Sequence, residues 1–442
     1  MTHQNLRNAI ERREATVAVI GMGYVGLPLS LAACGVGFRV LGMDIDAKRI
    51  GNLSKGISPI RTVSHEDVAN ANRSGRFDPS SDFTRLGEAD LIIICVPTPL
   101  TRNREPDLSY IEQSAEGIAR TLKRGQVVIL ESTTWPGTTQ QVVKPILEKT
   151  GLKADRDFHL AYSPEREDPG NAVFTTKTIP RVVGAASEVA LDLAATFYGQ
   201  IVDKVVRVSS TETAEAVKLT ENIFRSVNIA LVNELKTIFS RFGIDTWEVV
   251  NAASSKPFGF MAFYPGPGVG GHCIPVDPFY LTWKAREVEM PTRFIELAGE
   301  INASMPRYIV DSLIDAMSRR LQKSLAGSRI LLLGLAFKRD IEDVRESPAL
   351  KVFEILAEKG AKVDFYDPFV EALPTAHIAP SIAGRRSIVW DVKALTNYDA
   401  AVILTDHTTV DYATAAAQIP LIVDSRNATA RLSPVPGNVV KA

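Results

Sequence analysis

Short apolar runs rich in β-branched residues recur in the first half of the chain, and stretches with helical periodicity separate them. The first run, Thr16–Ile20, leads into a glycine-rich turn at residues 21–26 and then into a helical pattern at Leu27–Ala33. A second run, Phe38–Met43, ends at Asp44. Further runs follow at Leu91–Val96, Val127–Glu131, Phe158–Tyr162 and Arg181–Val183. Strands that alternate with helices predict an α/β fold with a doubly wound parallel sheet.

The pattern becomes helical in the middle of the chain and returns to α/β near the C-terminus. Helical spacing covers Ser210–Ser254 and Phe294–Lys323, and the second stretch is long enough to bridge two domains. Apolar runs then recur at Arg329–Gly334, Val363–Tyr366, Ala400–Leu404 and Leu421–Val423. We expect α/β domains at residues 1–205 and 324–442, joined by a helical middle domain at residues 206–323 with a long connecting helix. The tail, Leu432–Ala442, is rich in Pro and Ser and is predicted to be disordered.

The glycine-rich turn after the first predicted strand has the spacing of a dinucleotide-binding site. Gly21, Gly23 and Gly26 permit a tight turn, a close approach of a pyrophosphate and close packing of the following helix. Asp44, at the end of the second strand, can accept hydrogen bonds from the ribose hydroxyls of adenosine. Its charge would repel the additional phosphate of NADP. The pattern therefore predicts a Rossmann-like domain that binds NAD.

Polar residues follow several other predicted strands, where ligands bind to parallel α/β sheets. They form the segments Pro97-Thr98-Pro99, Ser132-Thr133-Thr134 and Ser163-Pro164-Glu165. We assign to the cofactor side the turn and strand-end residues Tyr24, Val25, Pro97, Thr98 and Thr133. Arg49 is either a neighbour of the ribose or phosphate or a surface charge.

One of the three cysteines, Cys273, lies between a glycine-rich loop and a predicted helix start at Asp277-Pro278. A helix N-terminus carries partial positive charge, which favours the thiolate form of a nearby cysteine. The glycines allow a ligand to approach the backbone closely. These features suit a cysteine nucleophile. The alternative is a buried structural cysteine in a turn.

Lys218 and Asn222 are four residues apart in a predicted helix and therefore share one of its faces. Glu215 is also a helical neighbour of Lys218. An exposed ion pair between Glu215 and Lys218 is therefore the alternative to a functional role for the lysine.

The composition is that of a globular enzyme. The chain has 442 residues and a formal net charge of -1, so no overall field favours nucleic acid or an anionic membrane. Cys34, Cys95 and Cys273 are far apart in sequence, which argues against a zinc site, other metal centres and a disulfide framework. Cys34 and Cys95 lie in apolar contexts and are expected to pack. The N-terminus has no apolar signal region, and Leu91–Val96 is too short to span a bilayer. We expect a cytoplasmic enzyme.

The motifs together are similar to those of the UDP-glucose/GDP-mannose dehydrogenase family over essentially the whole chain. They occur in the family's order as GMGYVG, VPTP, ESTT, SPE, Lys218 with Asn222, GGHCIPVDP, FKRDIEDVRES and DSRN. The resemblance implies an N-terminal NAD domain, a helical middle used for dimerisation and a C-terminal Rossmann-like domain that binds UDP. It also implies oxidation of the sugar C6 alcohol to a carboxylate with two molecules of NAD.

The resemblance implies roles for individual residues. Cys273 would attack the C6 aldehyde and form a thiohemiacetal and then a thioester. Lys218 and Asn222 would hold the oxyanion or bind water, and Asp277 would orient the lysine or activate water. Thr133 and Glu165 match positions linked to water and to acid–base work, and Glu165 also suits hydrolysis of the thioester.

The same comparison assigns binding residues in the second half of the chain. Lys338 and Arg426 fall at contacts to the uridine diphosphate, and Arg345 falls at a contact to the cofactor. Cations there suit a substrate that carries two phosphates. We assign to the substrate side Glu165, Lys218, Asn222, Gly270, Lys338 and Arg426.

The chain departs from the UDP-glucose branch at positions on the sugar side. His272 stands where that branch has a serine, and it is either a sugar or thiolate contact or a turn residue. Pro169 stands where that branch has a second glutamate, so Glu167 and Asp168 are only candidates for the second acid. In that branch, a neighbouring subunit also contributes an arginine to the substrate. No arginine near residues 255–258 of this chain matches it. The motifs GGHCIPVDPFYLTWKA and SPEREDPGN resemble those of the UDP-N-acetylhexosamine branch instead. They are most similar to those of the UDP-N-acetylglucosamine 6-dehydrogenases of surface polysaccharide synthesis.

The sequence also allows other functions. Within the same class, the substrate could be UDP-N-acetylmannosamine, UDP-N-acetylgalactosamine or UDP-glucose. A two-electron hydroxy-acid dehydrogenase would need neither Cys273 nor a second α/β domain. A non-catalytic sensor on the same fold predicts loss of a catalytic residue, whereas all four of Lys218, Asn222, Cys273 and Asp277 are present.

Overall fold

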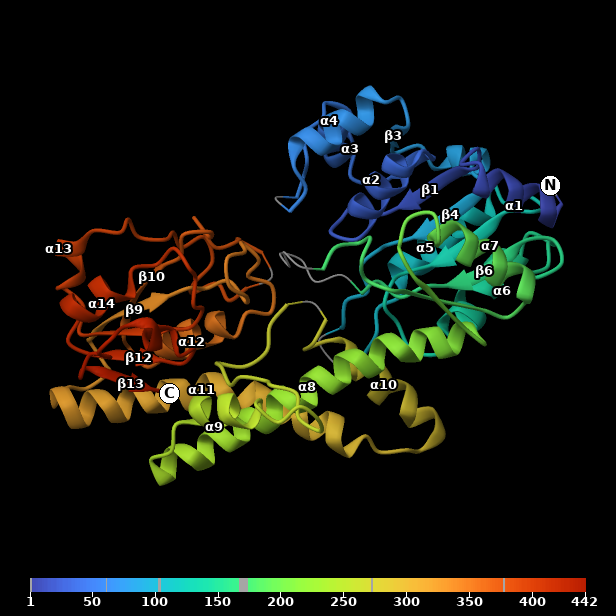
Figure 1. The fold of residues 1–442 in the computed structure, drawn as a ribbon. Helices are drawn as coiled ribbons and strands as arrows, with labels where there is room; N and C mark the ends of the chain where they lie inside the picture. The colour runs from blue at the N-terminus through green and yellow to red at the C-terminus, as the bar shows by residue number, and fades with distance from the viewer. Residues whose placement is uncertain (1, 61, 102–104, 167–173, 272, 377) are drawn as a thin grey trace. The chain divides into compact units, whose positions relative to one another are not determined.

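The computed structural model describes residues 2–60, 62–101, 105–166, 174–271, 273–376 and 378–442. The chain divides into two compact units. The first unit comprises Met1–Glu221 and Trp283–Met290, and the second comprises Asn222–Thr282 and Pro291–Ala442. Each unit contains one sheet with helices against it (Figure 1).

The first unit is built on an eight-stranded sheet. Its strands are β1 (Thr16–Ile20), β2 (Arg39–Met43), β3 (Phe77–Ser80), β4 (Leu91–Ile94), β5 (Val127–Leu130), β6 (His159–Tyr162), β7 (Arg181–Ala185) and β8 (Val205–Val208). Their order is β3-β2-β1-β4-β5-β6-β7-β8. All neighbours are parallel except β6 and β7, which pair in antiparallel fashion. The expected doubly wound sheet is therefore present, with one antiparallel step that the sequence pattern did not indicate.

Helices cover the first sheet. They are α1 (His3–Glu11), α2 (Gly26–Val36), α3 (Ala47–Ser54), α4 (His65–Arg73), η1 (Phe83–Glu88), α5 (Ser109–Ala119), η2 (Thr139–Val143), α6 (Lys144–Glu148) and α7 (Glu188–Tyr198). Val17, Val19 and Ile93 face a core shared with α1, α2 and α7. The alternate strand residues Ile92 and Val128 are equally buried, as expected for a parallel sheet that is covered on both faces.

The helical segment of the chain follows β8. It consists of α8 (Thr211–Phe242), α9 (Thr246–Ala253), α10 (Asp277–Ala285), η3 (Arg286–Val288) and α11 (Arg293–Leu321). The boundary between the two units falls within α8, after Glu221. Lys218 therefore belongs to the first unit and Asn222 to the second, although both are on one helix.

The second unit contains a five-stranded parallel sheet. Its strands are β9 (Arg329–Leu333), β10 (Lys362–Tyr366), β11 (Ala400–Ile403), β12 (Ile422–Asp424) and β13 (Val439–Lys441), in the order β10-β9-β11-β12-β13. The remaining helices are α12 (Pro348–Glu358), α13 (Val392–Leu395), α14 (Tyr412–Gln418) and η4 (Ala428–Arg431). Ile330 and Leu332 face a core with α11 and α12, whereas Leu331 and Leu333 face a core with α13 and α14.

Side-chain caps explain where many helices begin. Ser and Asp side chains accept backbone N–H groups in the first turn of α3, α4, α7, α9, α12, α13 and α14. Such caps satisfy amide groups that a helix cannot pair internally. Ser347 and Pro348 open α12, where the Ser347 side chain accepts the N–H of Ala349.

The prediction of a disordered tail is wrong. Residues 439–441 form β13, which pairs with β12, and Ala442 is buried against the core. The pairing satisfies the backbone groups at the edge of the sheet, which outweighs the Pro- and Ser-rich composition of the preceding residues.

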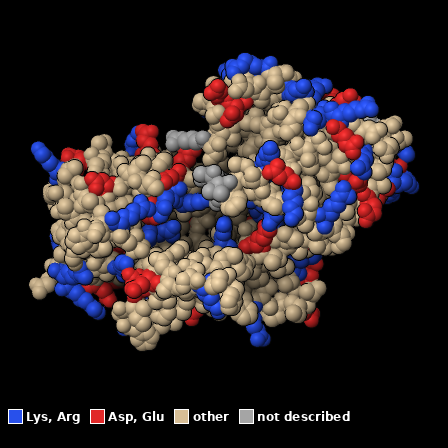
Figure 2. Space-filling view, viewed as in Figure 1, with Lys and Arg blue, Asp and Glu red and all other residues tan. Residues whose placement is uncertain are grey.

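The surface carries charges of both signs. Figure 2 shows basic and acidic side chains interspersed over the visible face, consistent with the net charge of -1. Within the described parts of the chain, no helix is long and apolar enough to cross a lipid bilayer.

Candidate active site

The turn between β1 and α2 has the geometry that its glycine pattern predicts. Gly21 has φ +97°, and an added Cβ would lie 2.4 Å from the carbonyl oxygen of Cys95. A Cβ on Gly26 would lie 1.9 Å from the carbonyl oxygen of Gly21. Only glycine fits at these two positions. At Gly23, no described atom lies within 4 Å of an added Cβ, so the turn leaves room for a pyrophosphate to approach.

Asp44 follows β2 and is in contact with this turn. Its Oδ2 accepts the N–H of Met22 at 2.9 Å and pairs with Nη1 of Arg49 at 2.8 Å, and its Oδ1 accepts the N–H of Asp46 at 2.9 Å. The carboxylate is buried. Arg49 is thus the ion-pair partner of the candidate ribose-binding acid, which favours its assignment to the cofactor side over an isolated surface charge.

The strand ends next to β1 carry the other predicted cofactor residues. The hydroxyl of Thr98 donates to the carbonyl oxygen of Thr133 at 2.7 Å. The hydroxyl of Ser132 accepts the N–H of Val96 at 3.0 Å and donates to its carbonyl oxygen at 2.8 Å. Because β1, β4 and β5 are neighbours, these bonds place Thr98, Thr133 and the adjacent Pro97 at the same sheet edge as the glycine turn.

Glu165, which is largely buried, forms an ion pair with the buried Lys218 in the first unit. Glu165 lies in the loop after β6, and its Oε2 is 3.3 Å from Nζ of Lys218 on α8. The two side chains are 12% and 7% exposed. Buried charges of this kind are stable only when they are paired. The structure therefore brings a carboxylate and an ammonium group together from segments 53 residues apart.

The alternative of an exposed pair between Glu215 and Lys218 is wrong, because both side chains are buried. Glu215 accepts the N–H and the hydroxyl of Thr139 at 2.9 and 2.6 Å, and it also accepts the N–H of Gly137. Burial raises its pKa to about 7, although these hydrogen bonds oppose the shift. Glu215 thus fastens α8 to the segment after Thr133.

In the second unit, Asn222 and Asp277 hold the turn that contains Cys273. Nδ2 of Asn222 donates to Oδ2 of Asp277 at 2.6 Å, and both side chains are buried. Asp277 begins α10, as its sequence context predicts, and its N–H donates to the carbonyl oxygen of Cys273 at 2.8 Å. Cys273 is half-buried, whereas Cys34 and Cys95 are buried, as expected for packing residues. Cys273 therefore lies at the N-terminus of a helix, where a thiolate is favoured.

The glycine loop before Cys273 packs closely on two segments of the second unit. A Cβ on Gly270 would lie 2.6 Å from Cβ of Phe337, and one on Gly266 would lie 2.5 Å from Nη1 of Arg426. The N–H of Gly271 donates to the carbonyl oxygen of Arg345 at 3.0 Å. The structure thus brings together four of the predicted binding segments, those of Gly270, Lys338, Arg345 and Arg426.

The loop after β9 carries the predicted cations. Lys338 is half-buried. Arg345 makes a two-pronged ion pair with Asp343, with Nε–Oδ1 and Nη2–Oδ2 distances of 3.0 and 2.6 Å. Residues 337 and 343 close the loop by a backbone hydrogen bond of 2.9 Å.

Sequence reasoning missed a second set of charged residues in this part of the chain. Asp406 is buried and pairs with Arg339, and also with Arg426 and Arg431 at 3.6 Å each. The segment Thr405-Asp406-His407 follows β11 after one residue, Leu404. It carries the strand-end signal that was used in the first half of the chain, so these residues could have been found.

Several predicted positions lie outside the described residues. They are Glu167, Asp168, Pro169 and His272. Over the parts of the chain that the structure describes, no group of three or more His, Cys, Asp or Glu residues is arranged to hold a metal ion.

Comparisons with known proteins agree with this geometry. Residues 15–202 match the NAD binding domain of the UDP-glucose/GDP-mannose dehydrogenase family, residues 212–304 match its central domain and residues 331–431 match its UDP binding domain. The open glycine turn and Asp44 of the first unit fit the cofactor that the family's first domain binds.

Curated relatives and solved structures match over most of their lengths. A UDP-N-acetyl-D-glucosamine 6-dehydrogenase of Pseudomonas aeruginosa is 38% identical, with 83% of this chain and 85% of that protein covered. A UDP-N-acetyl-D-mannosamine dehydrogenase of Escherichia coli strain K12 is 34% identical, with 89% and 94% covered.

Among solved structures, the UDP-D-ManNAc dehydrogenase of Pyrococcus horikoshii has a TM-score of 0.85 at 34% identity, with 93% of this chain and 96% of that chain covered. The match extends over all three parts of the fold. The chain therefore belongs to the UDP-glucose/GDP-mannose dehydrogenase family, and it is an NAD-dependent UDP-sugar dehydrogenase.

Proposed function

We propose that this enzyme oxidises the C6 alcohol of UDP-N-acetylglucosamine to the uronic acid in two NAD-dependent steps, for surface polysaccharide synthesis. The observation that carries the proposal is the turn before α10, where the N–H of Asp277 donates to the carbonyl oxygen of Cys273 and the side chain of Asp277 accepts a hydrogen bond from Asn222. A dehydrogenase that stopped at the aldehyde would need no nucleophile at the start of a helix.

The chemistry balances with Cys273 as the nucleophile. Two hydrides leave C6 in succession, each to a bound NAD. Between these two losses, the thiolate of Cys273 adds to the aldehyde carbon and forms a thiohemiacetal. Loss of the second hydride gives a thioester, and water then cleaves the carbon–sulfur bond to release the carboxylate and the thiol. The sum converts one alcohol, two NAD and one water into one carboxylate, two NADH and three protons.

The charged residues suit the steps around the thiolate. We assign the ammonium group of Lys218 to the oxyanion that develops when sulfur adds to the aldehyde. The carboxylate of Glu165, 3.3 Å from that ammonium, is assigned to deprotonate the water that hydrolyses the thioester. Asn222 and Asp277 position the turn of Cys273 through their hydrogen bond of 2.6 Å. Thr133 is assigned to hold water.

The binding residues divide between the two units. In the first unit, the turn at residues 21–26 with Asp44 and Arg49 is assigned to NAD, together with Pro97 and Thr98. In the second unit, Lys338 and Arg426 are assigned to the two phosphates of UDP, and Gly270 to a close approach of the substrate. Arg345 is assigned to the cofactor.

The substrate assignment rests on similarity. Relatives from Pseudomonas aeruginosa and Salmonella typhi carry the name UDP-N-acetyl-D-glucosamine 6-dehydrogenase. Others are UDP-N-acetyl-D-mannosamine dehydrogenases, and solved structures include an NDP-N-acetyl-D-galactosaminuronic acid dehydrogenase and a UDP-glucose dehydrogenase. The alternative substrates are therefore UDP-N-acetylmannosamine, UDP-N-acetylgalactosamine and UDP-glucose.

A panel of substrates decides between these UDP-sugars. The purified enzyme is supplied with NAD and each of the four, and kcat/KM is measured from NADH absorbance. We expect the highest kcat/KM with UDP-N-acetylglucosamine. A higher value with the mannosamine or galactosamine epimer would replace the proposed substrate, and no turnover with any of them would contradict the function.

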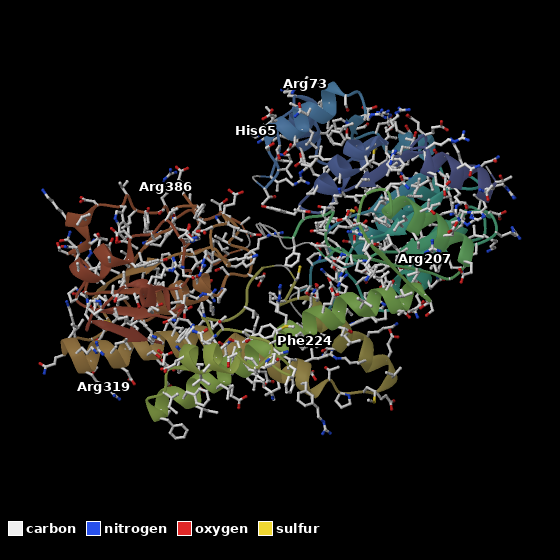
Figure 3. The ribbon with its side chains drawn as sticks, in the orientation of Figure 1. His65, Arg73, Arg207, Phe224, Arg319 and Arg386 are labelled. Atoms are coloured by element: carbon white, nitrogen blue, oxygen red, sulfur yellow. The ribbon has the colours of Figure 1, made fainter. Side chains whose placement is uncertain are left out.

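We further propose that the enzyme is a homodimer whose interface includes α8. This helix exposes the apolar side chains Phe224, Leu231, Ile238 and Phe242 at intervals of seven, seven and four residues. Figure 3 labels Phe224 on α8. Such spacing places them along one face, which suits packing against a second helix. A substitution such as Leu231→Glu should shift the mass measured by light scattering from dimer to monomer, and a wild-type monomer would contradict the proposal.

The division of labour along the chain follows from these assignments. We propose an NAD domain at residues 1–205, a helical domain at residues 206–323 that carries Lys218 and Cys273, and a UDP-sugar domain at residues 324–442. We also propose that the enzyme works in the cytoplasm, where UDP-sugars and NAD are both available.

A further inference from the structure

Arg166 follows Glu165 in the loop after β6 and binds α8 with two nitrogen atoms. Its Nη2 and Nε lie 2.5 and 3.2 Å from Oε1 and Oε2 of Glu221. Its remaining terminal nitrogen, Nη1, donates to the carbonyl oxygen of Pro180 at 2.6 Å. This is the two-pronged geometry in which an arginine holds a carboxylate most firmly.

The two consecutive loop residues reach two positions on one face of α8. Glu165 pairs with Lys218, and Arg166 pairs with Glu221, three residues further along the helix. Residues three apart on a helix are neighbours on its surface. The loop therefore presents an acid and then a base, and the helix presents a base and then an acid. Each ion pair holds the loop at the position along α8 that the other pair requires.

The loop is also fastened to β7 on its other side. The hydroxyl of Ser163 donates to the carbonyl oxygen of Val182 at 2.8 Å and accepts Nε of Arg181 at 2.9 Å. Arg181 is itself buried in an ion pair with Glu131. Arg166 links Pro180, the residue before β7, to Glu221 on α8.

We propose that Arg166 is a positioning residue, which with Glu221 holds the carboxylate of Glu165 against Lys218. The inference rests on the proposed roles of Glu165 and Lys218 in the reaction. Because Nε, Nη1 and Nη2 of Arg166 are all engaged by protein oxygens, the structure does not direct this arginine to a substrate phosphate. Its loss should therefore lower kcat and leave the KM values unchanged.

The test compares Arg166→Met, Glu221→Gln and the double variant, with Arg85→Met as the matched control. The side chain of Arg85 is 25% exposed and that of Arg166 is 26% exposed, and Arg85 also makes ion pairs with two acids of the first unit. We expect Arg166→Met to lower kcat roughly tenfold to a hundredfold, the scale of a misplaced reacting group. The KM values for NAD and UDP-sugar should change by less than about twofold, since the residues assigned to the phosphates of UDP, Lys338 and Arg426, and the glycine turn assigned to NAD are untouched.

Coupling distinguishes positioning from a general structural role. The double variant should have the same kcat as Arg166→Met alone, because either change breaks the same pair. Arg166→Lys should recover part of the lost kcat, whereas Arg85→Met should have wild-type kcat. Thermal unfolding of all variants shows whether any loss reflects unfolding.

Three results would overturn the inference: a wild-type kcat in folded Arg166→Met, additive losses in the double variant, or a raised KM for the UDP-sugar with unchanged kcat, which would make Arg166 a substrate contact. Glu165→Gln is assayed alongside. If it turns over normally, the proposed role of Glu165 fails and this inference fails with it. If Glu165→Gln is impaired and Arg166→Met is not, only the positioning role is wrong.

Discussion

The turn after β1 and the turn after β9 occupy equivalent places in two parallel sheets. Each begins with a glycine of positive φ, +97° at Gly21 and +82° at Gly334, where a neighbouring carbonyl group leaves no room for a Cβ. In each sheet the adjacent strand, β2 or β10, leads to an aspartate, Asp44 or Asp367, that accepts backbone N–H groups of the turn. The two halves of the chain thus repeat one structural solution.

The two aspartates differ in what they have left to bind. Asp44 accepts two backbone N–H groups and Arg49, which is a movable side chain. Asp367 accepts four backbone N–H groups and also contacts Nε2 of His407 at 3.1 Å, with its side chain fully buried. Asp367 therefore has no accessible oxygen for a ribose, and the first sheet alone retains the dinucleotide pattern.

The segments that follow the turns differ as well. α2 begins at Gly26, directly after the first turn, whereas residues 335–347 form a loop before α12. That loop carries Lys338, Arg339 and Arg345. On the proposed assignments, the same fold binds phosphates by a tight glycine turn in one domain and by cationic side chains in the other.

Cys273→Ser tests whether the nucleophile lies outside both sheets. Because the nucleophile is assigned to the turn before α10, carboxylate formation should fall by roughly a thousandfold or more, as on loss of a catalytic nucleophile. NAD affinity, measured by calorimetry, should be unchanged. Carboxylate formation at the wild-type rate would remove the covalent mechanism.

Lys338→Ala tests whether cationic side chains of the second domain bind the phosphates of UDP. The KM for the UDP-sugar should rise roughly tenfold to a hundredfold, since a hydrogen bond to a charged group contributes about 1.5–3 kcal/mol. Lys351→Ala, at an exposed position of α12, is the control and should have the wild-type KM. A larger change in NAD affinity than in substrate KM would move Lys338 to the cofactor side.

Asp44→Ala tests whether the first domain binds the adenosine ribose of NAD through Asp44. NAD should bind more weakly by about 1–3 kcal/mol, the scale of a lost charged hydrogen bond. Asp367→Asn, at the equivalent position of the second sheet, should leave NAD affinity unchanged. Equal effects of both substitutions on NAD affinity would break the comparison.

Asp367 also predicts a pH dependence of stability. Burial alone would raise its pKa, but the hydrogen bonds from His407, Ala336 and Leu335 hold the pKa below its usual value of 3.8. The depressed pKa stabilises the fold above about pH 4. This contribution is lost as the pH falls through the folded pKa.

Melting curves from pH 6 to pH 3 measure this contribution. The wild type should lose more of its melting temperature over this range than Asp367→Asn, by a few degrees, roughly what 1 kcal/mol produces. Parallel curves for the two proteins would contradict the assignment.

The sequence predicts those features of the fold that depend on residues close together in the chain. The spacing of Gly21, Gly23 and Gly26 predicts the first turn, and the apolar runs predict most strands of both sheets. The pairs that complete the site join distant residues: Glu215 binds Thr139 across 76 residues, and Arg166 binds Glu221 across 55. No local periodicity records such contacts, and the helical spacing of Glu215 and Lys218 predicted a different pair.

The edges of the sheets were also hard to predict. β3 and β13 have only four and three residues, and β3 contains Pro79, which is disfavoured in strands. Their pairing with β2 and β12 decides their conformation. Since pairing depends on the neighbouring strand, composition alone gave the wrong result for Leu432–Ala442.

The number of NADH molecules formed per UDP-N-acetylglucosamine consumed tests the central claim most directly. The sugar is supplied in limiting amount, NADH is measured by absorbance, and the residual sugar and its product are quantified by chromatography. Two NADH per sugar, with the uronic acid as product, is the predicted result. One NADH per sugar, with the aldehyde as product, would contradict the role of Cys273 as the nucleophile.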